Sequence, residues 1–151
     1  MANNLVGTTV ILIRHADRTS STNPDPPLNT KGKARAQKLI HVLGQAGIVA
    51  IYHSHFTRSK QTAHPLAAQL LGIATTQIDE ALEIKNNILA NHAGQAVLVI
   101  GHSDTVPDLI NQLSGGHMPV INDSEFDNLF IVTIFDTGKA SIIRLKYGEP
   151  T

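Results

Sequence analysis

Three runs of aliphatic residues constrain the fold of this chain most strongly. They are Val10–Ile13, Val49–Tyr52 and Val97–Ile100, and there is a weaker run at Thr75–Ile78. A strand with one solvated face alternates apolar and polar residues, whereas a strand covered on both faces is apolar throughout. Because the three main runs do not alternate, they predict strands of a parallel sheet with helices packed on both faces.

The segments between these runs have the apolar spacing of helices, with apolar residues three or four positions apart. They span residues 36–46, 66–71 and 81–88. Pro65 falls in the second helical region, where it predicts a kink or a late helix start, because proline disrupts the interior of a helix. The alternation of strands and helices indicates an α/β fold.

The C-terminal region has a different pattern. Leu129–Phe135 and Ile142–Leu145 flank the turn sequence Asp-Thr-Gly-Lys, which is typical of an antiparallel hairpin. We therefore expect a three-layer α/β/α fold with a mostly parallel sheet and a C-terminal antiparallel hairpin at its edge. With 151 residues and neither a repeat nor a linker, the chain is expected to form a single domain over residues 1–151.

The charge balance and residue usage exclude several classes of protein. Twelve basic residues balance twelve acidic ones, so no net positive field attracts nucleic acid or an anionic membrane. The absence of cysteine excludes disulfides, thiolate nucleophiles and cysteine-ligated zinc. No apolar run approaches the ~20 residues that span a bilayer, and the N-terminus lacks the pattern of a signal peptide. We expect a cytoplasmic protein, although an exported chain whose signal had been removed would look the same.

Charged residues follow the ends of the predicted strands, where open α/β sheets bind ligands. The first strand ends in Arg14 and His15, the second is followed by Arg58, and the last of the three runs is followed by His102 and Asp104. Arginine presents a planar fork of donors to phosphate oxygens, and histidine can act as a nucleophile, acid or base near neutral pH. Because the carboxyl ends of parallel strands lie at the same edge, the pattern predicts a phosphate pocket that contains a histidine.

Three segments also resemble a known family. "LIRHAD", "SHFTRSKQTAHPLA" and "VLVIGHSDTVPDL" are similar, in order and spacing, to three signatures of the histidine phosphatase superfamily, which includes the cofactor-dependent phosphoglycerate mutases. The resemblance implies that His15 is a nucleophile that forms a phosphohistidine, while Arg14, Arg58 and His102 hold the phosphoryl oxygens. It implies no metal and no other cofactor.

These roles require different protonation states of the two histidines. His15 must be neutral to attack phosphorus, and we expect the nearby arginines to lower its pKa. His102 binds an anion better when it is charged, so we expect a carboxylate or the bound phosphate to favour its protonated form.

Two acidic residues are candidates for the general acid that protonates the leaving group. Glu83 lies in "ALEI", which resembles the segment that supplies a glutamate in mutase-like members, but it lies much closer in sequence to His102 than in mutases. Asp104 lies two residues after His102, whereas the acid phosphatase branch places an aspartate directly after that histidine. A third alternative is that no dedicated acid exists, which would favour a phosphoramidate or an aryl phosphate with a good leaving group.

Other residues near these motifs have more than one interpretation. Arg18 could contact a remote charge on the substrate, whereas Asp17 is expected to be structural, as a helix cap or as the partner of Arg18. His53, His55 and His64 could in principle ligate a metal, although packing or solvation is the simpler interpretation.

The combined prediction is a small, metal-independent phosphatase that acts on a phosphate monoester or a phosphoramidate. The alternatives are a phosphoglycerate-mutase-like phosphotransferase and a non-catalytic module that binds phosphate or a phosphoprotein. The substrate would be a small phosphorylated metabolite or a phosphoprotein, and the sequence identifies neither the substrate nor the oligomeric state. The family's small phosphohistidine phosphatases resemble this chain in size.

Overall fold

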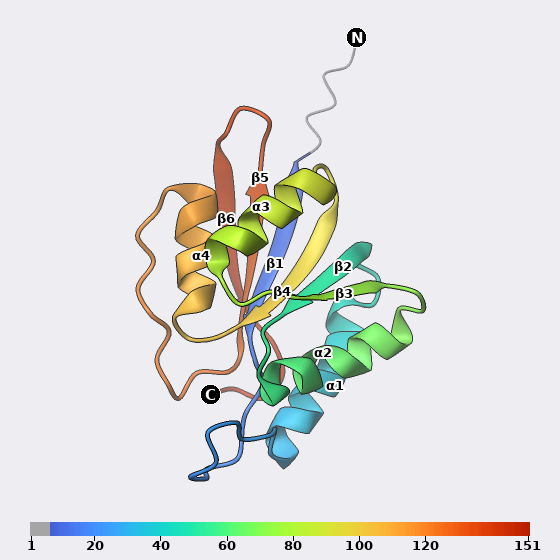
Figure 1. The fold of residues 1–151 in the computed structure, drawn as a ribbon, viewed down its shortest axis with the longest axis vertical. Helices are drawn as coiled ribbons and strands as arrows, with labels where there is room; N and C mark the ends of the chain where they lie inside the picture. Colours follow the sequence, from blue (N-terminus) through green and yellow to red (C-terminus); the bar gives the residue numbers. More distant parts are fainter. Residues whose placement is uncertain (1–6) are drawn as a thin grey trace.

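A six-stranded sheet in the order β3-β2-β4-β1-β5-β6 forms the centre of the computed structural model, which describes residues 7–151 (Figure 1). The strands are β1 (Thr8–Arg14), β2 (Ile48–His53), β3 (Ala74–Gln77), β4 (Ala96–Gly101), β5 (Asn128–Ile134) and β6 (Ala140–Lys146). The helices are α1 (Thr30–Leu43), α2 (Thr57–Gln69), α3 (Ala81–Asn91) and α4 (Thr105–Ser114). Strands and helices alternate along the chain as far as α4, and the hairpin β5-β6 follows.

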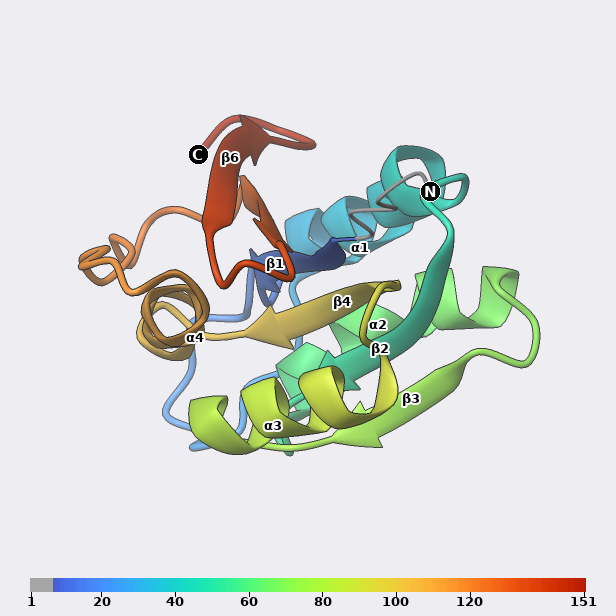
Figure 2. The same cartoon turned by 90° about the horizontal axis from the view of Figure 1, so that it is seen from above.

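The pairing of the strands confirms the predicted sheet. β1 to β4 pair with parallel neighbours, whereas β5 is antiparallel to β1 and β6 is antiparallel to β5 at the edge. Figure 2 shows the twist of this sheet, in which β6 is turned steeply relative to β3. Arg14 at the end of β1 pairs with Gly101 at the end of β4. The carboxyl ends of these two central strands therefore lie side by side.

Helices cover both faces of the sheet. Leu39 of α1 and Leu66 of α2 belong to one buried apolar cluster, and Ile88 of α3 and Leu109 of α4 belong to another. Consecutive residues of β1 alternate between the two clusters, as expected for a strand buried on both faces. Figure 1 shows α3 crossing in front of the sheet. Among residues 7–151, no helix has the length and apolar character needed to cross a membrane.

Two local features differ from the sequence expectations. Val49 lies in a predicted buried run but is 38% exposed. The register with β4 shifts between Ile48 and Ala50, so Val49 is the extra residue of a bulge. Helix α2 begins at Thr57 and continues through Pro65, so the late helix start is wrong.

A buried ion pair joins the start of α1 to the chain just beyond β1. Arg35 Nε donates to Asp17 Oδ2 at 2.6 Å, and both side chains are almost fully buried. Gly32 passes so close to Asp17 that a Cβ atom would lie 1.9 Å from the Asp17 carbonyl oxygen. The structural role of Asp17 is confirmed, with Arg35 rather than Arg18 as its partner.

Candidate active site

A pocket of about 550 Å³ lies at the carboxyl ends of the parallel strands. Six of the seven candidate residues line it, namely Arg14, His15, Arg18, Arg58, His102 and Asp104. They come from the end of β1, the first turn of α2 and the segment between β4 and α4. Glu83 is exposed in the first turn of α3 and is not among the residues that line this pocket.

The two ring nitrogens of His15 have different surroundings. The side chain is buried, and Nδ1 lies 2.8 Å from the carbonyl oxygen of Ala16. Because that oxygen can only accept, Nδ1 carries the proton and Nε2 is unprotonated. Nε2 accepts a hydrogen bond from Arg58 Nε at 3.2 Å. In the free protein, the lone pair of Nε2 is therefore engaged by the guanidinium group of Arg58 at the pocket.

Burial lowers the pKa of His15 to about 3. The Ala16 carbonyl opposes this shift, whereas the nearby His102, Arg14 and Arg58 reinforce it. The ring is therefore neutral at pH 7, as a nucleophile requires. The arginines act in the expected direction, but removal of the ring from water is the larger cause.

His102 lies beside His15, with ring centroids 5.2 Å apart, and is held by the hydroxyl of Ser54. Its Nε2 lies 2.8 Å from Ser54 Oγ, and Ser54 in turn donates to Ser59 Oγ at 2.9 Å. Since Ser54 gives its proton to Ser59, Nε2–H of His102 donates to Ser54. No hydrogen bond joins Nδ1 of His102 to another residue in the described part of the chain, so this nitrogen remains for a ligand.

Burial, with Arg58 as the next cause, lowers the pKa of His102 to about 4. Asp104 and Asp79 raise this pKa, but their effect is smaller than that of burial. The free protein therefore holds a neutral His102 at pH 7. We expected a carboxylate or the bound phosphate to favour a charged His102. The carboxylates alone do not keep this ring charged in the free protein.

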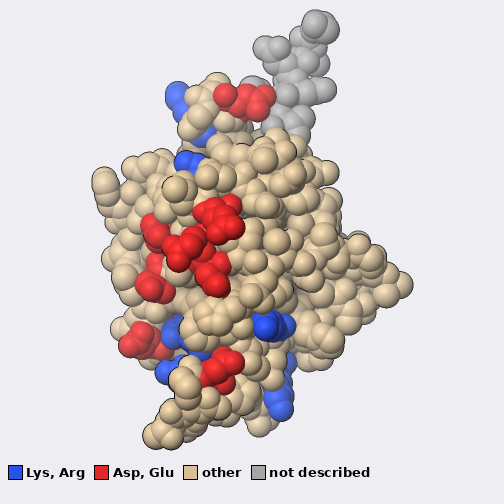
Figure 3. Space-filling view, viewed as in Figure 1, with Lys and Arg blue, Asp and Glu red and all other residues tan. Residues whose placement is uncertain are grey.

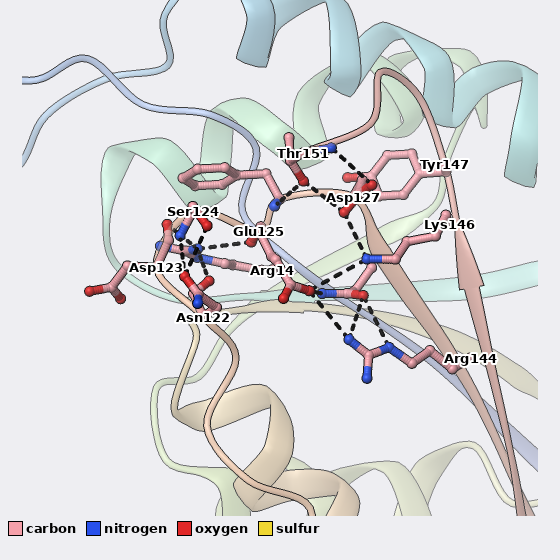
Figure 4. Close-up of polar contacts among 12 residues, drawn as sticks. Arg14, Asn122, Asp123, Ser124, Glu125, Asp127, Arg144, Lys146, Tyr147 and Thr151 are labelled. Carbon is pink, nitrogen blue, oxygen red and sulfur yellow. Dashed lines mark hydrogen bonds and ion pairs between the residues drawn. The ribbon is translucent and has the colours of Figure 1, made fainter.

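Backbone carbonyls, rather than a carboxylate, hold Arg14 (Figure 4). Its Nη1 donates to the carbonyl oxygens of Asn122 (3.3 Å), Asp123 (2.9 Å) and Glu125 (2.9 Å). The guanidinium group also lies 4.1 Å from the ring centroid of Phe126. Its Nε is buried without a hydrogen-bond partner. The positive charge of Arg14 is therefore not consumed by an ion pair and can attract an anion.

Arg58 is placed by the first turn of α2 and by an aromatic ring. Its guanidinium group lies 4.3 Å from the ring centroid of Phe56, and its Nη1 is buried without a hydrogen-bond partner. Asp25 accepts hydrogen bonds from the backbone N and the hydroxyl of Thr57 and so holds the start of α2. The nearest Asp25 oxygen is 4.0 Å from Arg58 Nη1. Arg58 therefore also retains a free donor at the pocket.

Acidic side chains gather over α3 and α4, as Figure 3 shows. The exposed acidic residues in this region are Asp79, Glu80, Glu83, Asp104 and Asp108. Of these five, Asp79, Glu80 and Asp104 line the pocket. One carboxylate oxygen of Asp104 accepts a hydrogen bond from the backbone N of Thr105 and caps α4. Its other oxygen has no hydrogen bond to a described residue.

A second hollow, of about 350 Å³, adjoins the pocket, and Arg14, Arg18 and Asp123 line both. The Arg18 carbonyl accepts from Asn29 Nδ2 at 3.0 Å, and the Arg18 backbone bridges to Leu28. The backbone is thus fixed. In residues 7–151 no acceptor or carboxylate binds the Arg18 guanidinium group, which remains for a ligand in either hollow.

Of the three histidines considered as metal ligands, two have hydrogen-bond contacts and the third is exposed. His53 Nδ1 lies 2.9 Å from the Ser54 carbonyl, His55 Nδ1 lies 2.9 Å from Asp79 Oδ1, and His64 is exposed on α2. In the part of the chain that the structure describes, no three His, Cys, Asp or Glu side chains form a group that could hold a metal ion.

Two residues of the site were not singled out by the sequence. Ser54 lies four positions before Arg58 at the start of a quoted motif, so a signal for it was present. Glu80, by contrast, follows the third strand at the edge where the sequence places the site, and it lines the pocket. Phe126 and the carbonyls that hold Arg14 carry no sequence signal, because every residue supplies a carbonyl oxygen.

The chain was compared with known proteins. A model of the histidine phosphatase superfamily, branch 1, matches residues 10–85, just over half of the chain. A search of curated protein sequences finds no match. Solved structures that share the fold include the protein histidine phosphatase SixA complexed with tungstate, with a TM-score of 0.74 and 23% sequence identity, covering 91% of this chain and 96% of that one.

Two further structures show the same architecture at lower sequence identity. YhfR from Bacillus stearothermophilus has a TM-score of 0.73 and 19% identity, covering 89% of this chain and 95% of its own. A mycobacterial glucosyl-3-phosphoglycerate phosphatase has a TM-score of 0.73 and 11% identity, covering 94% of this chain and 100% of its own. The match to the family model over residues 10–85 shows that the chain belongs to the histidine phosphatase superfamily, branch 1.

Proposed function

We propose that the protein is a phosphatase that hydrolyses a phosphate monoester or a phosphoramidate through a covalent phosphohistidine on His15, without a metal ion. The main support for this proposal is the protonation state of His15. Its Nδ1 proton is bound to the Ala16 carbonyl, and its unprotonated Nε2 lies beside Arg58. A neutral imidazole is suited to attack phosphorus once Arg58 Nε donates to a phosphoryl oxygen instead of to Nε2.

The reaction has two steps. In the first, Nε2 of His15 attacks phosphorus, the N–P bond forms, and the bond to the leaving oxygen or nitrogen breaks. The leaving atom keeps the electron pair and takes up a proton. In the second, water attacks phosphorus and loses a proton, the N–P bond breaks, and inorganic phosphate leaves a neutral His15. Two steps of lower barrier replace one difficult displacement.

The two arginines would stabilise the charge on the transferring phosphoryl group. Arg14 Nε and Arg58 Nη1 are both buried without a hydrogen-bond partner. A buried donor without an acceptor costs about 1–3 kcal/mol. A phosphoryl oxygen at this position would remove that penalty, so binding of the anion is favoured beyond its simple charge attraction.

His102 would change its protonation state when substrate binds. Its pKa of about 4 in the free protein makes it neutral, and a phosphate dianion beside it would raise that pKa. The second proton would occupy Nδ1, because Nε2–H already donates to Ser54. A charged His102 would then share the phosphoryl oxygens with Arg14 and Arg58.

Asp104 is the proposed general acid, because it lines the pocket while Glu83 does not. Asp104→Asn should slow an alkyl phosphate far more than an aryl phosphate, whose leaving group departs without help from an acid. Glu83→Gln and Glu80→Gln are the matched variants. If none of the three slows the alkyl phosphate, no dedicated acid exists and a good leaving group is required.

The substrate is proposed to be a small phosphorylated metabolite or a phosphoprotein, with Arg18 contacting a remote negative charge. The unpartnered guanidinium group and the adjoining hollow of about 350 Å³ support this contact. Arg18→Gln should raise KM for a phosphorylated hydroxy acid more than for its neutral alcohol analogue. An equal change for both compounds would remove Arg18 from substrate recognition.

The decisive experiment uses an aryl phosphate in the presence of EDTA. The reaction is quenched, and both an acid-labile phosphoryl adduct and released phosphate are measured. Release that survives EDTA, is lost in His15→Ala and persists in His41→Ala supports the proposal. The control residue His41 is exposed on α1.

Other outcomes identify the alternatives. An adduct without release would favour a mutase-like phosphotransferase, which retains the phosphoryl group. The absence of both would favour a phosphate-binding module, and loss of release in EDTA would indicate a metal.

A further inference from the structure

The irregular connection between α4 and β5 determines where the Arg14 guanidinium group lies. Its Nη1 is bound by three carbonyl oxygens of residues 122–125, which we call the carbonyl segment. Nε and Nη2 have no hydrogen bond to any residue in the described part of the chain, so this edge is the one left for an anion. A shift of the carbonyl segment would therefore move the donors that meet the phosphoryl group.

A buried carboxylate fastens the chain next to this segment. Asp127 is 4% exposed. Its Oδ1 accepts from Thr151 Oγ1 at 2.7 Å and from Lys146 Nζ at 3.0 Å, and its Oδ2 accepts from Thr151 N at 3.2 Å. Its carbonyl oxygen accepts from Tyr147 N at 2.9 Å. Figure 4 shows the contacts of the Asp127 side chain, which join the connection to β6 and to the chain beyond it.

One hydroxyl group links this carboxylate to the residue packed on Arg14. Thr151 Oγ1 donates to Asp127 and accepts from the backbone N of Phe126 at 3.0 Å. The Phe126 ring lies 4.1 Å from the Arg14 guanidinium carbon and 5.9 Å from the His15 ring, centroid to centroid. The hydroxyl thus connects two successive residues, of which one contacts Arg14 directly.

We propose that Asp127 and Thr151 are positioning residues for Arg14. They hold the carbonyl segment and Phe126 so that the free edge of the guanidinium group meets the phosphoryl oxygens. This inference rests on the proposed function to the extent that Arg14 binds those oxygens. It assigns a role in the site to contacts that come from the far end of the chain.

The test compares Thr151→Val, which removes the hydroxyl, with Thr151→Ser, which retains it. Thr8→Val is the matched control, because the Thr8 hydroxyl likewise accepts from a backbone N, that of Gly94, at the opposite end of β1. We expect Thr151→Val to weaken binding of inorganic phosphate, measured by calorimetry, by about five- to tenfold. Thr151→Ser and Thr8→Val should stay within about twofold of the wild type.

A double-mutant cycle with Arg14 separates positioning from general destabilisation. In the Arg14→Ala background, and in Arg14→Lys as a second background, Thr151→Val should change phosphate affinity by less than about twofold. Thermal unfolding of each variant sets a working temperature at which all are folded. Equal weakening in the wild-type and Arg14→Ala backgrounds, or equal weakening by Thr151→Val and Thr8→Val, overturns the proposal.

The outcomes also distinguish failure of the positioning role from failure of the proposed function. If the wild-type protein binds phosphate and Thr151→Val binds it equally well, positioning fails while the proposed function stands. If the wild-type protein neither binds phosphate nor releases it from an aryl phosphate, the proposed function fails and positioning falls with it.

Discussion

His15 should make the stability of the fold depend on pH. Burial lowers its pKa to about 3 in the folded protein, from an ordinary value of 6.5 in the unfolded chain. Between these two values the unfolded chain binds the proton and the folded protein does not. The stability that a neutral His15 provides is therefore fully present above pH 6.5 and is lost as the pH falls toward 3.

The size of this effect follows from the two pKa values. One proton bound only by the unfolded chain changes the free energy of unfolding by about 1.4 kcal/mol per pH unit. Lowering the pH from 8 to 5 should therefore cost about 2 kcal/mol through His15 alone, most of it below pH 6.5. The lowered pKa of His102 acts in the same direction, so the total loss in the wild type is larger. The contribution of His15 is therefore obtained by comparing the loss of stability in the wild type with the loss in a variant that lacks this histidine.

Urea unfolding followed by far-UV circular dichroism measures this share, since the chain has no tryptophan to report by fluorescence. The buffers contain no phosphate, which would stabilise the folded state by binding. Between pH 8 and pH 5, His15→Gln should lose about 2 kcal/mol less stability than the wild type. His41→Gln, at an exposed position on α1, should follow the wild type. If the free energy of unfolding had the same pH dependence in the wild type and in His15→Gln, the reasoning would be refuted. His15 would then have the same pKa in the folded and unfolded states.

Three further variants test the contacts around the site. Arg35→Leu should lower the free energy of unfolding by about 3–5 kcal/mol in urea, because it leaves the buried Asp17 carboxylate unpaired; a loss below about 1 kcal/mol would show that the pair is dispensable. Gly32→Ala should destabilise by at least the ~1–3 kcal/mol typical of overpacking, because its Cβ would meet the Asp17 carbonyl, and a wild-type melting temperature would show that α1 can shift. Ser54→Ala should lower kcat about tenfold in a folded protein, because His102 Nε2 loses its acceptor; unchanged kcat would mean that Ser54 does not orient this ring.

The sequence predicted the strands and the convergence of the main candidate residues, because both depend on local patterns joined by a general rule of topology. Runs such as Val10–Ile13 are typical of buried strands flanked by helices, and parallel strands place their carboxyl ends at the same edge of the sheet. Arg14, His15 and His102 lie directly at those ends, so the topology alone brings them together. Arg58 also lies at this edge, because α2 begins just after the carboxyl end of β2 and Arg58 is in its first turn.

Contacts between distant backbone groups could not be predicted in this way. Arg14 is held by carbonyls of residues 122–125, and the sequence indicates only a polar connection there. Thr151 reaches the same connection from beyond β6, and no periodicity links the two segments. The bulge at Val49 is likewise a matter of register between two strands, which an apolar run does not reveal.

The direction of a pKa shift was predicted only where burial and the neighbouring charges act in the same direction. For His15, burial and the neighbouring cations act together, so the direction was correct from the sequence. For His102, carboxylates raise the pKa while burial and Arg58 lower it, and the result depends on how deeply the ring lies in the protein. Depth of burial comes from packing, and the motif around His102 does not encode it.

The general acid is difficult to predict for a different reason, because Asp104 already has a structural task. One of its carboxylate oxygens accepts a hydrogen bond from Thr105 N and caps α4, a contact worth about 0.5–2 kcal/mol. The proposed role would add the transfer of a proton to the leaving group, and the other oxygen, which has no hydrogen bond to a described residue, remains for it. Spacing along the sequence does not show how the two oxygens are divided between these tasks, because that depends on how the segment between β4 and α4 folds. A substrate whose leaving group needs no proton would require nothing of Asp104 beyond the cap.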